Sequence, residues 1–316
     1  MKIAVLDAET LGDDINVAKR FGSLGETTVY ASTSPEQTAE RVSDADVVIV
    51  NKVKLGRDNL ENAEKLKLIC VAATGYDNID IEYCRAHGIT VCNVVGYSTD
   101  SVAQTTVATV LELTTHIRAF SEYVRDGSYT ASGVANKVTP VYRELASKTW
   151  GVVGLGNIGK KVAAIASAFG CKVIANKRTP EAGYECVDLE TLCKKSDIIS
   201  IHTPLTPDTR DLIGEKEIAQ MKDGVILYNA ARGAVTDETA VANAVKSGKI
   251  GALGCDVYSF EPMTKTHPYF EIKGYDNVCL TPHMAWGSYE ARNRCVDEMI
   301  ENIKAFYSGN KRNALC

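Results

Sequence analysis

The stretch Thr149-Trp150-Gly151-Val152-Val153-Gly154-Leu155-Gly156-Asn157-Ile158-Gly159 decides the fold of this chain. An apolar strand runs into three glycines spaced G-x-G-x-x-G, and the Ala-rich segment 162–166 then continues as a helix. The first glycine permits a tight turn, the second lets backbone approach a pyrophosphate, and the third lets helix and strand pack closely. The helix N-terminus favours negative charge. The stretch therefore predicts a dinucleotide-binding turn made by Gly154, Leu155, Gly156, Asn157, Ile158 and Gly159, with an ordinary βα turn as the alternative.

The residues after the next predicted strand, 172–175, bear on the identity of the nucleotide. An acidic residue about 20 positions beyond the glycines normally binds the ribose hydroxyls. Lys177, Arg178 and Thr179 follow that strand instead. Two cations and a hydroxyl suit a 2′-phosphate, which a carboxylate would repel. The sequence therefore favours NADP(H) as cofactor and leaves NAD(H) open, because a solvated basic loop has the same composition.

Composition limits the class of protein. The chain has 316 residues, 45% of them hydrophobic, and a net charge of −5, so it can bury a large core and exceeds one typical domain. The acidic balance argues against nucleic acid or an anionic membrane as partner, and no apolar run approaches the roughly 18 residues of a membrane span. The ten cysteines form no C-x-x-C pair, which indicates reduced thiols and no metal site. We expect a cytoplasmic protein.

Short apolar runs on both sides of the glycine turn indicate two sheets. Five runs precede it, at 3–6, 28–30, 47–50, 68–72 and 90–93, and after the strand at 172–175 three more follow, at 198–201, 225–228 and 253–257. Segments 101–116 and 289–307 read as long helices, the first connecting the two domains. We predict an α/β protein of two Rossmann-like or flavodoxin-like domains with doubly wound parallel sheets and a cleft between them. Residues 1–98 plus 290–316 form the substrate-binding domain, and residues 99–289 form the dinucleotide-binding domain.

Six motifs follow one another along nearly the whole chain. They are Ala73 to Asp80, Gly154 to Gly159, His202 to Pro207, Asn229 to Gly233, Asp256 through Glu261-Pro262, and Thr281 to Trp286. In this order they resemble the D-isomer-specific 2-hydroxyacid dehydrogenase family, and segments 51–53, 100–104 and 285–286 resemble its glycerate dehydrogenases and hydroxypyruvate reductases. The resemblance implies an oxidoreductase that reduces a small 2-ketoacid, such as hydroxypyruvate or glyoxylate, with NAD(P)H.

The resemblance also implies a catalytic triad of Arg232, Glu261 and His283. Arg232 would bind the substrate carboxylate and polarise the ketone, because a planar guanidinium donates two parallel hydrogen bonds. His283 would donate a proton to the developing alkoxide, since imidazole titrates near neutral pH. Glu261 would orient the ring and favour its protonated form by opposite charge. The alternatives are a surface ion pair, a structural histidine and a solvated carboxylate.

Substrate binding is implied for a second group of residues. Thr74, Gly75 and Tyr76 lie in the loop whose backbone amides would hold the substrate carboxylate, with Lys52 adding charge nearby. A plain turn is the alternative. Gln104 and Thr105 depart from relatives that often have an acidic residue or a histidine there, which leaves the contact between their helix and the active site open.

Cofactor binding is implied for a third group. Thr203 and Pro204 would line the adenosine end of the cofactor, with loop or packing roles as the alternative. Asp256 would accept a hydrogen bond from the nicotinamide carboxamide, with help from the carbonyl of Ala230.

Segment 119–145 mixes apolar and polar residues and resembles the family's dimerisation arm, so we expect a homodimer; a surface loop is the alternative. Its apolar positions are Tyr123, Tyr129, Val134, Val138 and Tyr142. The other function class left open is a nucleotide-sensing binding protein, like the corepressor relatives of the family. Those relatives typically carry added tails that this compact chain lacks, which favours the enzyme.

Overall fold

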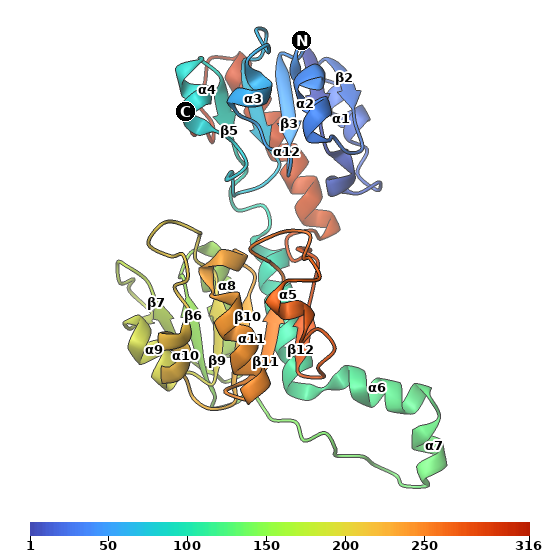
Figure 1. The fold of residues 1–316 in the computed structure, drawn as a ribbon, viewed down its shortest axis with the longest axis vertical. Helices are drawn as coiled ribbons and strands as arrows, with labels where there is room; N and C mark the ends of the chain where they lie inside the picture. Colours follow the sequence, from blue (N-terminus) through green and yellow to red (C-terminus); the bar gives the residue numbers. More distant parts are fainter. The chain divides into compact units, whose positions relative to one another are not determined.

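The computed structural model describes residues 1–316, which form two compact units (Figure 1). Unit 1 comprises Met1–Ser98 and Gly287–Cys316, and unit 2 comprises Thr99–Trp286. The chain returns to unit 1 at Gly287 and not at the predicted residue 290. Ser288, whose side chain accepts a hydrogen bond from Ala291 N–H and caps the last helix, therefore already belongs to unit 1.

The sheet of unit 1 has five parallel strands in the order β2-β1-β3-β4-β5, the order of flavodoxin-like folds. The strands are β1 (Lys2–Val5), β2 (Glu26–Val29), β3 (Val47–Val50), β4 (Leu68–Val71) and β5 (Thr90–Cys92). The helices are α1 (Val17–Gly22), α2 (Pro35–Val42), α3 (Arg57–Leu60), α4 (Ile81–Ala86) and α12 (Tyr289–Tyr307), with a short 3-10 helix η1 (Ala8–Leu11). One face of the sheet packs against α2, α3 and α4. The long helix α12 packs against β4 and α1, so the end of the chain completes the first unit.

The sheet of unit 2 has seven parallel strands in the order β12-β11-β10-β9-β6-β7-β8. The strands are β6 (Thr149–Val153), β7 (Lys172–Asn176), β8 (Glu185–Cys186), β9 (Ile198–Ile201), β10 (Val225–Asn229), β11 (Ile250–Cys255) and β12 (Val278–Leu280). The order reverses between β6 and β9, and ligands of open α/β sheets bind outside the carboxyl ends of the strands at such a point. The predicted fold class, two doubly wound α/β domains, is confirmed.

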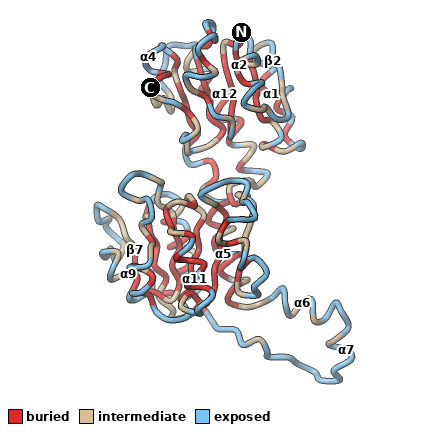
Figure 2. Tube along the Cα trace, viewed as in Figure 1, coloured by how far each residue is buried: buried red, intermediate tan, exposed pale blue.

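The helices of unit 2 cover both faces of its sheet, because successive strand residues point to opposite sides. Trp150 and Val152 of β6 pack beneath α5 and α8, whereas Val153 packs beneath α9, α10 and α11. These helices are α5 (Thr99–Thr115), α8 (Asn157–Ala168), α9 (Leu189–Lys195), α10 (Glu215–Gln220) and α11 (Glu238–Ser247), with 3-10 helices η2 (Gly233–Val235) and η3 (Pro268–Phe270). Figure 2 shows the buried sheet between exposed helix faces.

An arm leaves the body of unit 2 after α5 (Figure 1). It contains α6 (Ile117–Arg125) and α7 (Ser128–Ser132) and returns as an extended segment to the buried Leu145. Neither arm helix buries a residue (Figure 2). In the extended segment, Val138 and Val141 are 71% and 70% exposed.

Sequence periodicity missed two edge strands and shortened a third. Strands β8 and β12 have two and three residues, which is too short for an alternating pattern to be recognised. Strand β11 begins at Ile250 and not at the predicted residue 253, because Gly251 and Gly254 interrupt its apolar run.

Candidate active site

The glycine turn lies at the carboxyl end of β6, beside the loop that follows β9. Gly154 has a φ of +93°, and a Cβ there would lie 2.7 Å from the Thr203 nitrogen. A Cβ on Gly159 would lie 2.2 Å from the Gly154 oxygen. Gly156 faces open space and begins α8 without a capping side chain, so the first N–H groups of the helix keep no side-chain acceptor. These residues fit a pyrophosphate, because the close-packed glycines hold the turn and the open one admits a ligand.

The end of β7 differs from the simple basic loop that the sequence suggested. Lys177 forms an ion pair with Glu181, and Glu181 also pairs with Lys160 of α8. The two lysines, Lys160 first, lower the pKa of Glu181. Arg178 and Thr179 are exposed. Sequence reasoning missed Glu181, because the segment between β7 and β8 is irregular and gives no spacing from which a pairing could be predicted.

His283 and Glu261 meet beyond the carboxyl ends of β12 and β11. His283 Nδ1 lies 2.7 Å from Glu261 Oε2, and the two side chains are 23% and 29% exposed. Glu261 Oε1 also accepts the Tyr258 N–H at 3.1 Å. The Tyr258 hydroxyl donates to the Thr281 carbonyl at 2.9 Å and so joins the two catalytic segments. His283 itself has a φ of +53°, a strained backbone conformation of the kind that clusters at functional sites.

Asp256 holds the turn that carries His283. Its Oδ1 accepts Thr281 Oγ1–H at 2.6 Å and Met284 N–H at 2.9 Å, and its Oδ2 accepts Ala285 N–H at 2.9 Å. The carboxyl group is 1% exposed, and burial raises its pKa against the opposing effect of these donors. The sequence analysis did not foresee this bracing role, and the predicted contact with the carboxamide remains a prediction.

Helix α5 reaches the same turn through a residue that the sequence analysis did not select. Ser101 Oγ donates to the Ala285 carbonyl at 2.6 Å, and the hydroxyl is buried. Gln104, where the sequence departs from its relatives, is exposed on α5. The helix therefore contacts the turn that carries His283 through Ser101, about one helical turn before Gln104.

Arg232 lies in the turn after β10. Buried Asn229 shapes this turn, because its Nδ2 donates to the Arg232 carbonyl and its Oδ1 accepts the Ala231 N–H, both at 3.0 Å. The Arg232 guanidinium donates to the Ala231 carbonyl at 2.8 Å. A Cβ on Gly233 would lie 2.0 Å from the Tyr258 carbonyl carbon, so the Arg232 turn packs directly on the Glu261 loop. The structure thus places the Arg232 turn against the Tyr258–Ser259 segment that leads to Glu261, and the triad itself remains a prediction.

A second carboxylate and imidazole pair, Glu238 and His267, anchors the loop that carries Glu261 through Ser259. Buried Glu238 accepts the Ser259 N–H at 2.9 Å and the His267 Nε2–H at 2.9 Å. His267 Nδ1 accepts the Tyr269 N–H, so the proton of the neutral ring lies on Nε2. Sequence reasoning missed this pair, because nothing local relates residues 29 positions apart.

Four of the residues predicted to bind substrate, Lys52, Thr74, Gly75 and Tyr76, belong to unit 1. Buried Asp7 accepts the backbone N–H groups of residues 51, 52 and 53 and thereby shapes the turn that carries Lys52. Burial raises the pKa of Asp7 although the three N–H groups oppose that shift. Asn78 Nδ2 donates to the Val53 carbonyl at 2.8 Å, tying the Lys52 turn to the loop of Thr74, Gly75 and Tyr76. Tyr76 is 40% exposed.

The remaining cofactor candidates lie in the glycine turn or in the loops that follow β9 and β10. Leu155 is 1% exposed in the core, so only its backbone can face a ligand, and Ile158 packs against the same core. Asn157 and Pro204 are exposed, and Thr203 and Ala230 are partly buried. His202, beside Thr203, has its Nε2 atom 3.0 Å from Ser200 Oγ, and burial lowers its pKa to about 3.

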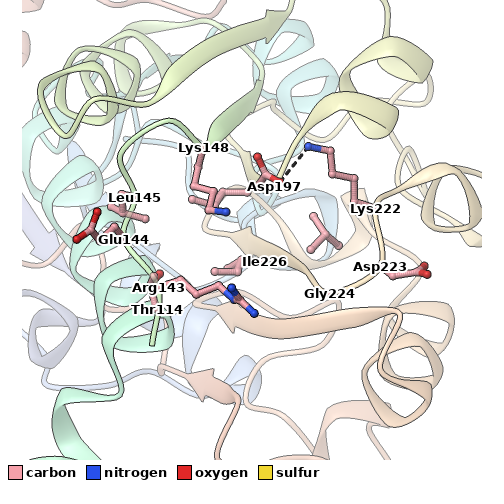
Figure 3. A pocket seen from close by; sticks show the side chains of 12 residues that line it. Thr114, Arg143, Glu144, Leu145, Lys148, Asp197, Lys222, Asp223, Gly224 and Ile226 are labelled. Atoms are coloured by element: carbon pink, nitrogen blue, oxygen red, sulfur yellow. Dashed lines mark hydrogen bonds and ion pairs between the residues drawn. The ribbon is translucent and has the colours of Figure 1, made fainter. Parts of the chain in front are cut away.

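A metal-ligand cluster, a membrane-spanning helix or a further cavity would each point to an additional function. No three His, Cys, Asp or Glu side chains gather to hold a metal ion, and no helix has the length and apolar content needed to cross a bilayer. A cavity of about 360 Å³ lies at the amino ends of β9 and β10, lined by Arg143, Lys148 and the Lys222–Asp197 ion pair (Figure 3). Arg232, Glu261 and His283 follow the carboxyl ends of their strands, so this cavity is a separate feature.

A dinucleotide-type turn and a carboxylate–imidazole pair on the same sheet edge are the parts that a dinucleotide-dependent oxidoreductase requires. The model of the D-isomer specific 2-hydroxyacid dehydrogenase NAD binding domain matches residues 107–285. The chain belongs to the D-isomer specific 2-hydroxyacid dehydrogenase family.

Relatives cover the chain from end to end. The chain is 37% identical to a glycerate dehydrogenase of Methylorubrum extorquens over 99% of its own length and 98% of the relative. It is 34% identical to a hydroxypyruvate reductase of Blautia hydrogenotrophica over 100% and 99%. Among solved structures, an acyclic imino acid reductase in complex with NADPH and D-Arg has a TM-score of 0.88 at 33% identity, with 100% of both chains covered. A D-lactate dehydrogenase from Aquifex aeolicus, complexed with NAD and lactic acid, has a TM-score of 0.85 at 29% identity, covering 98% and 96%.

Proposed function

We propose that this protein reduces hydroxypyruvate or glyoxylate to the D-2-hydroxyacid, with NADPH preferred over NADH. The observation that carries the proposal is the 2.7 Å contact between His283 and Glu261, a positioned proton donor beside the Arg232 turn. Relatives named glycerate dehydrogenase, hydroxypyruvate reductase and glyoxylate reductase support the substrate class.

In the proposed mechanism, Arg232 binds the substrate carboxylate and polarises the ketone through its forked donors. The reduced nicotinamide supplies the hydride when bound. Glu261 accepts the His283 Nδ1–H, so the proton given to the developing alkoxide leaves from Nε2. The negative charge of Glu261 stabilises the imidazolium and holds the ring in one orientation. In the reverse reaction, His283 removes the same proton.

We also propose a division of binding between the units. Unit 2 holds the dinucleotide: Gly154 to Gly159 at the pyrophosphate, Thr203 and Pro204 at the adenosine, and Asp256 with the Ala230 carbonyl at the carboxamide. Lys177, Arg178 and Thr179 bind the 2′-phosphate. In unit 1, Lys52 and the backbone amides of Thr74, Gly75 and Tyr76 bind the substrate carboxylate.

The test is oxidation of NADPH and of NADH, followed by absorbance, with a panel of hydroxypyruvate, glyoxylate and pyruvate. We expect turnover with the first two acids, higher kcat/KM with NADPH, and loss of turnover in the His283→Ala variant. Tight binding of either nucleotide without turnover of any ketoacid would contradict the proposal and favour the nucleotide-sensing binding protein.

We propose that two copies associate through the arm of residues 117–145. Its most exposed apolar side chains, Ile117, Val138 and Val141, need cover that a monomer does not provide. The Val138→Asp/Val141→Asp variant should sediment as a monomer at micromolar concentration where the wild type sediments as a dimer. A monomeric wild type would refute the dimer.

The free cysteines agree with the proposed cytoplasmic location, because all ten lack a disulfide partner. Cell fractionation should recover the protein with cytosolic markers, and recovery in a membrane or secreted fraction would contradict this location.

A further inference from the structure

A cluster of three charged side chains occupies the place where dinucleotide-binding folds recognise the adenosine ribose. Glu181 pairs with Lys160 from the first turn of α8 and with Lys177, the residue after β7. Gly154 N–H donates to the Asn176 carbonyl at 3.0 Å, so the cluster borders the glycine turn. In many such folds an acidic residue near this point binds the ribose hydroxyls. Here a carboxylate reaches the same region from further along the chain and is engaged by two lysines.

We propose that Glu181 is a specificity-determining residue that competes with the 2′-phosphate of NADPH for Lys160 and Lys177. The inference rests on the proposed binding of a nicotinamide dinucleotide by unit 2. A 2′-phosphate, with a charge of about −1.5 to −2, must share both ammonium groups with a carboxylate that already holds them. The uncharged 2′-hydroxyl of NADH does not need these ammonium groups. Glu181 therefore narrows the preference for NADPH over NADH without abolishing it.

The local charges support competition over a fixed structural role. The side chains of Lys160, Glu181 and Lys177 are 36%, 29% and 34% exposed, so they can rearrange when a ligand arrives. Arg178 is exposed and forms no ion pair, so it stays available to the phosphate. These four side chains sum to a charge of +2, which balances a doubly ionised phosphate, and removal of Glu181 leaves +3.

The experiment measures binding by calorimetry, with adenosine 2′,5′-bisphosphate and 5′-AMP as a pair of ligands that differ only in the 2′-phosphate. The ratio of their dissociation constants reports recognition of that phosphate and needs no catalysis. In Glu181→Gln we expect the ratio to shift about 2- to 30-fold toward the bisphosphate, the range expected for two partly exposed ion pairs. Salt should reduce the shift, because the contacts are charge pairs near the surface.

A matched control is Glu185→Gln, which removes the same charge at a different place. Glu185 is the first residue of β8 and pairs at 3.2 Å with Lys172, the first residue of β7, whereas Lys177 follows the other end of β7. It should leave the ratio within about twofold of the wild type. Adding Lys160→Gln to Glu181→Gln should remove the gain, because one of the two freed ammonium groups is then missing.

Three results would overturn the proposal. An unchanged or reduced ratio in Glu181→Gln would mean that the carboxylate orders the lysines for the phosphate or does nothing. Selective loss of 5′-AMP and NADH affinity would make Glu181 a ribose acceptor. An equal shift of the ratio in Glu185→Gln would mean that the shift comes from the net charge of the protein and not from the position of Glu181. If the wild type prefers NADH but Glu181→Gln still shifts the ratio, the proposed NADPH preference fails and the role of Glu181 stands.

Discussion

Replacing Gly233 by alanine tests whether the Arg232 turn and the Glu261 loop work as one rigid assembly. A Cβ at this position would lie 2.0 Å from the Tyr258 carbonyl carbon and 2.1 Å from the Ser259 nitrogen. Ordinary van der Waals contact begins at 3.4 Å, so the two segments must separate by about 1.4 Å, the difference from 2.0 Å. Both contacts are to backbone, and no side-chain rotation can relieve them.

The separation should lower both activity and stability. A misplacement of about 1 Å in an active site can reduce the rate by about 10²-fold, and overpacking of this kind costs about 1–3 kcal/mol of unfolding free energy. We therefore expect Gly233→Ala to lose about 10²-fold in kcat/KM. Its dissociation constant for NADPH should stay near the wild-type value, because the glycine turn before α8 is untouched.

The measurements are steady-state kinetics with hydroxypyruvate, NADPH binding by fluorescence, and urea unfolding. The matched control is Gly274→Ala in the same unit, because a Cβ there meets nothing within 4 Å and its φ is not left-handed. The reasoning is refuted if Gly233→Ala keeps kcat/KM within about threefold of the control, since the packed loops would then not position Arg232 and Glu261.

Four further predictions concern single functions. His283→Ala should lower kcat by about 10²- to 10⁴-fold with NADPH affinity little changed, and near-normal turnover would reject the acid/base role. Arg232→Lys should impair both KM and kcat, because it keeps the charge and loses the forked geometry; unchanged constants would reject the carboxylate role. Replacing Lys177 and Arg178 by neutral residues should weaken NADPH about 10- to 100-fold and spare NADH, and an equal loss of both cofactors would show that the loop does not read the 2′-phosphate. His202 binds a proton near pH 6.5 when unfolded and only at about 3 when folded, so the stability it contributes is present above pH 6.5 and is lost as the pH falls toward 3. Urea unfolding at pH 7 and pH 5 should show wild type losing about 1–2 kcal/mol relative to His202→Gln, and parallel pH profiles would contradict it.

Local sequence patterns were sufficient for the parts of this protein whose physics is local. A glycine spacing specifies a turn because only glycine tolerates the φ of Gly154 and the close approach at Gly159. Apolar runs specify buried parallel strands, and α12 was predicted with its observed bounds because a long periodic helix is the clearest pattern. The catalytic candidates came from ordered motifs that resemble a family, and the chain belongs to that family.

Only the tertiary structure decided which side chains hold these motifs in place. Asp256 braces the His283 turn, Glu238 anchors the loop of Glu261, and Glu181 pairs with Lys177, which the sequence assigned to a phosphate, and with Lys160 of α8. The contacts of Asp256, of Glu238 and of Glu181 with Lys160 join residues from different loops or helices, and a carboxylate in a sequence looks the same whether it is solvated, buried or paired. Partner choice depends on which chain segments the two sheets bring together, and that is a property of the folded chain and not of any local stretch.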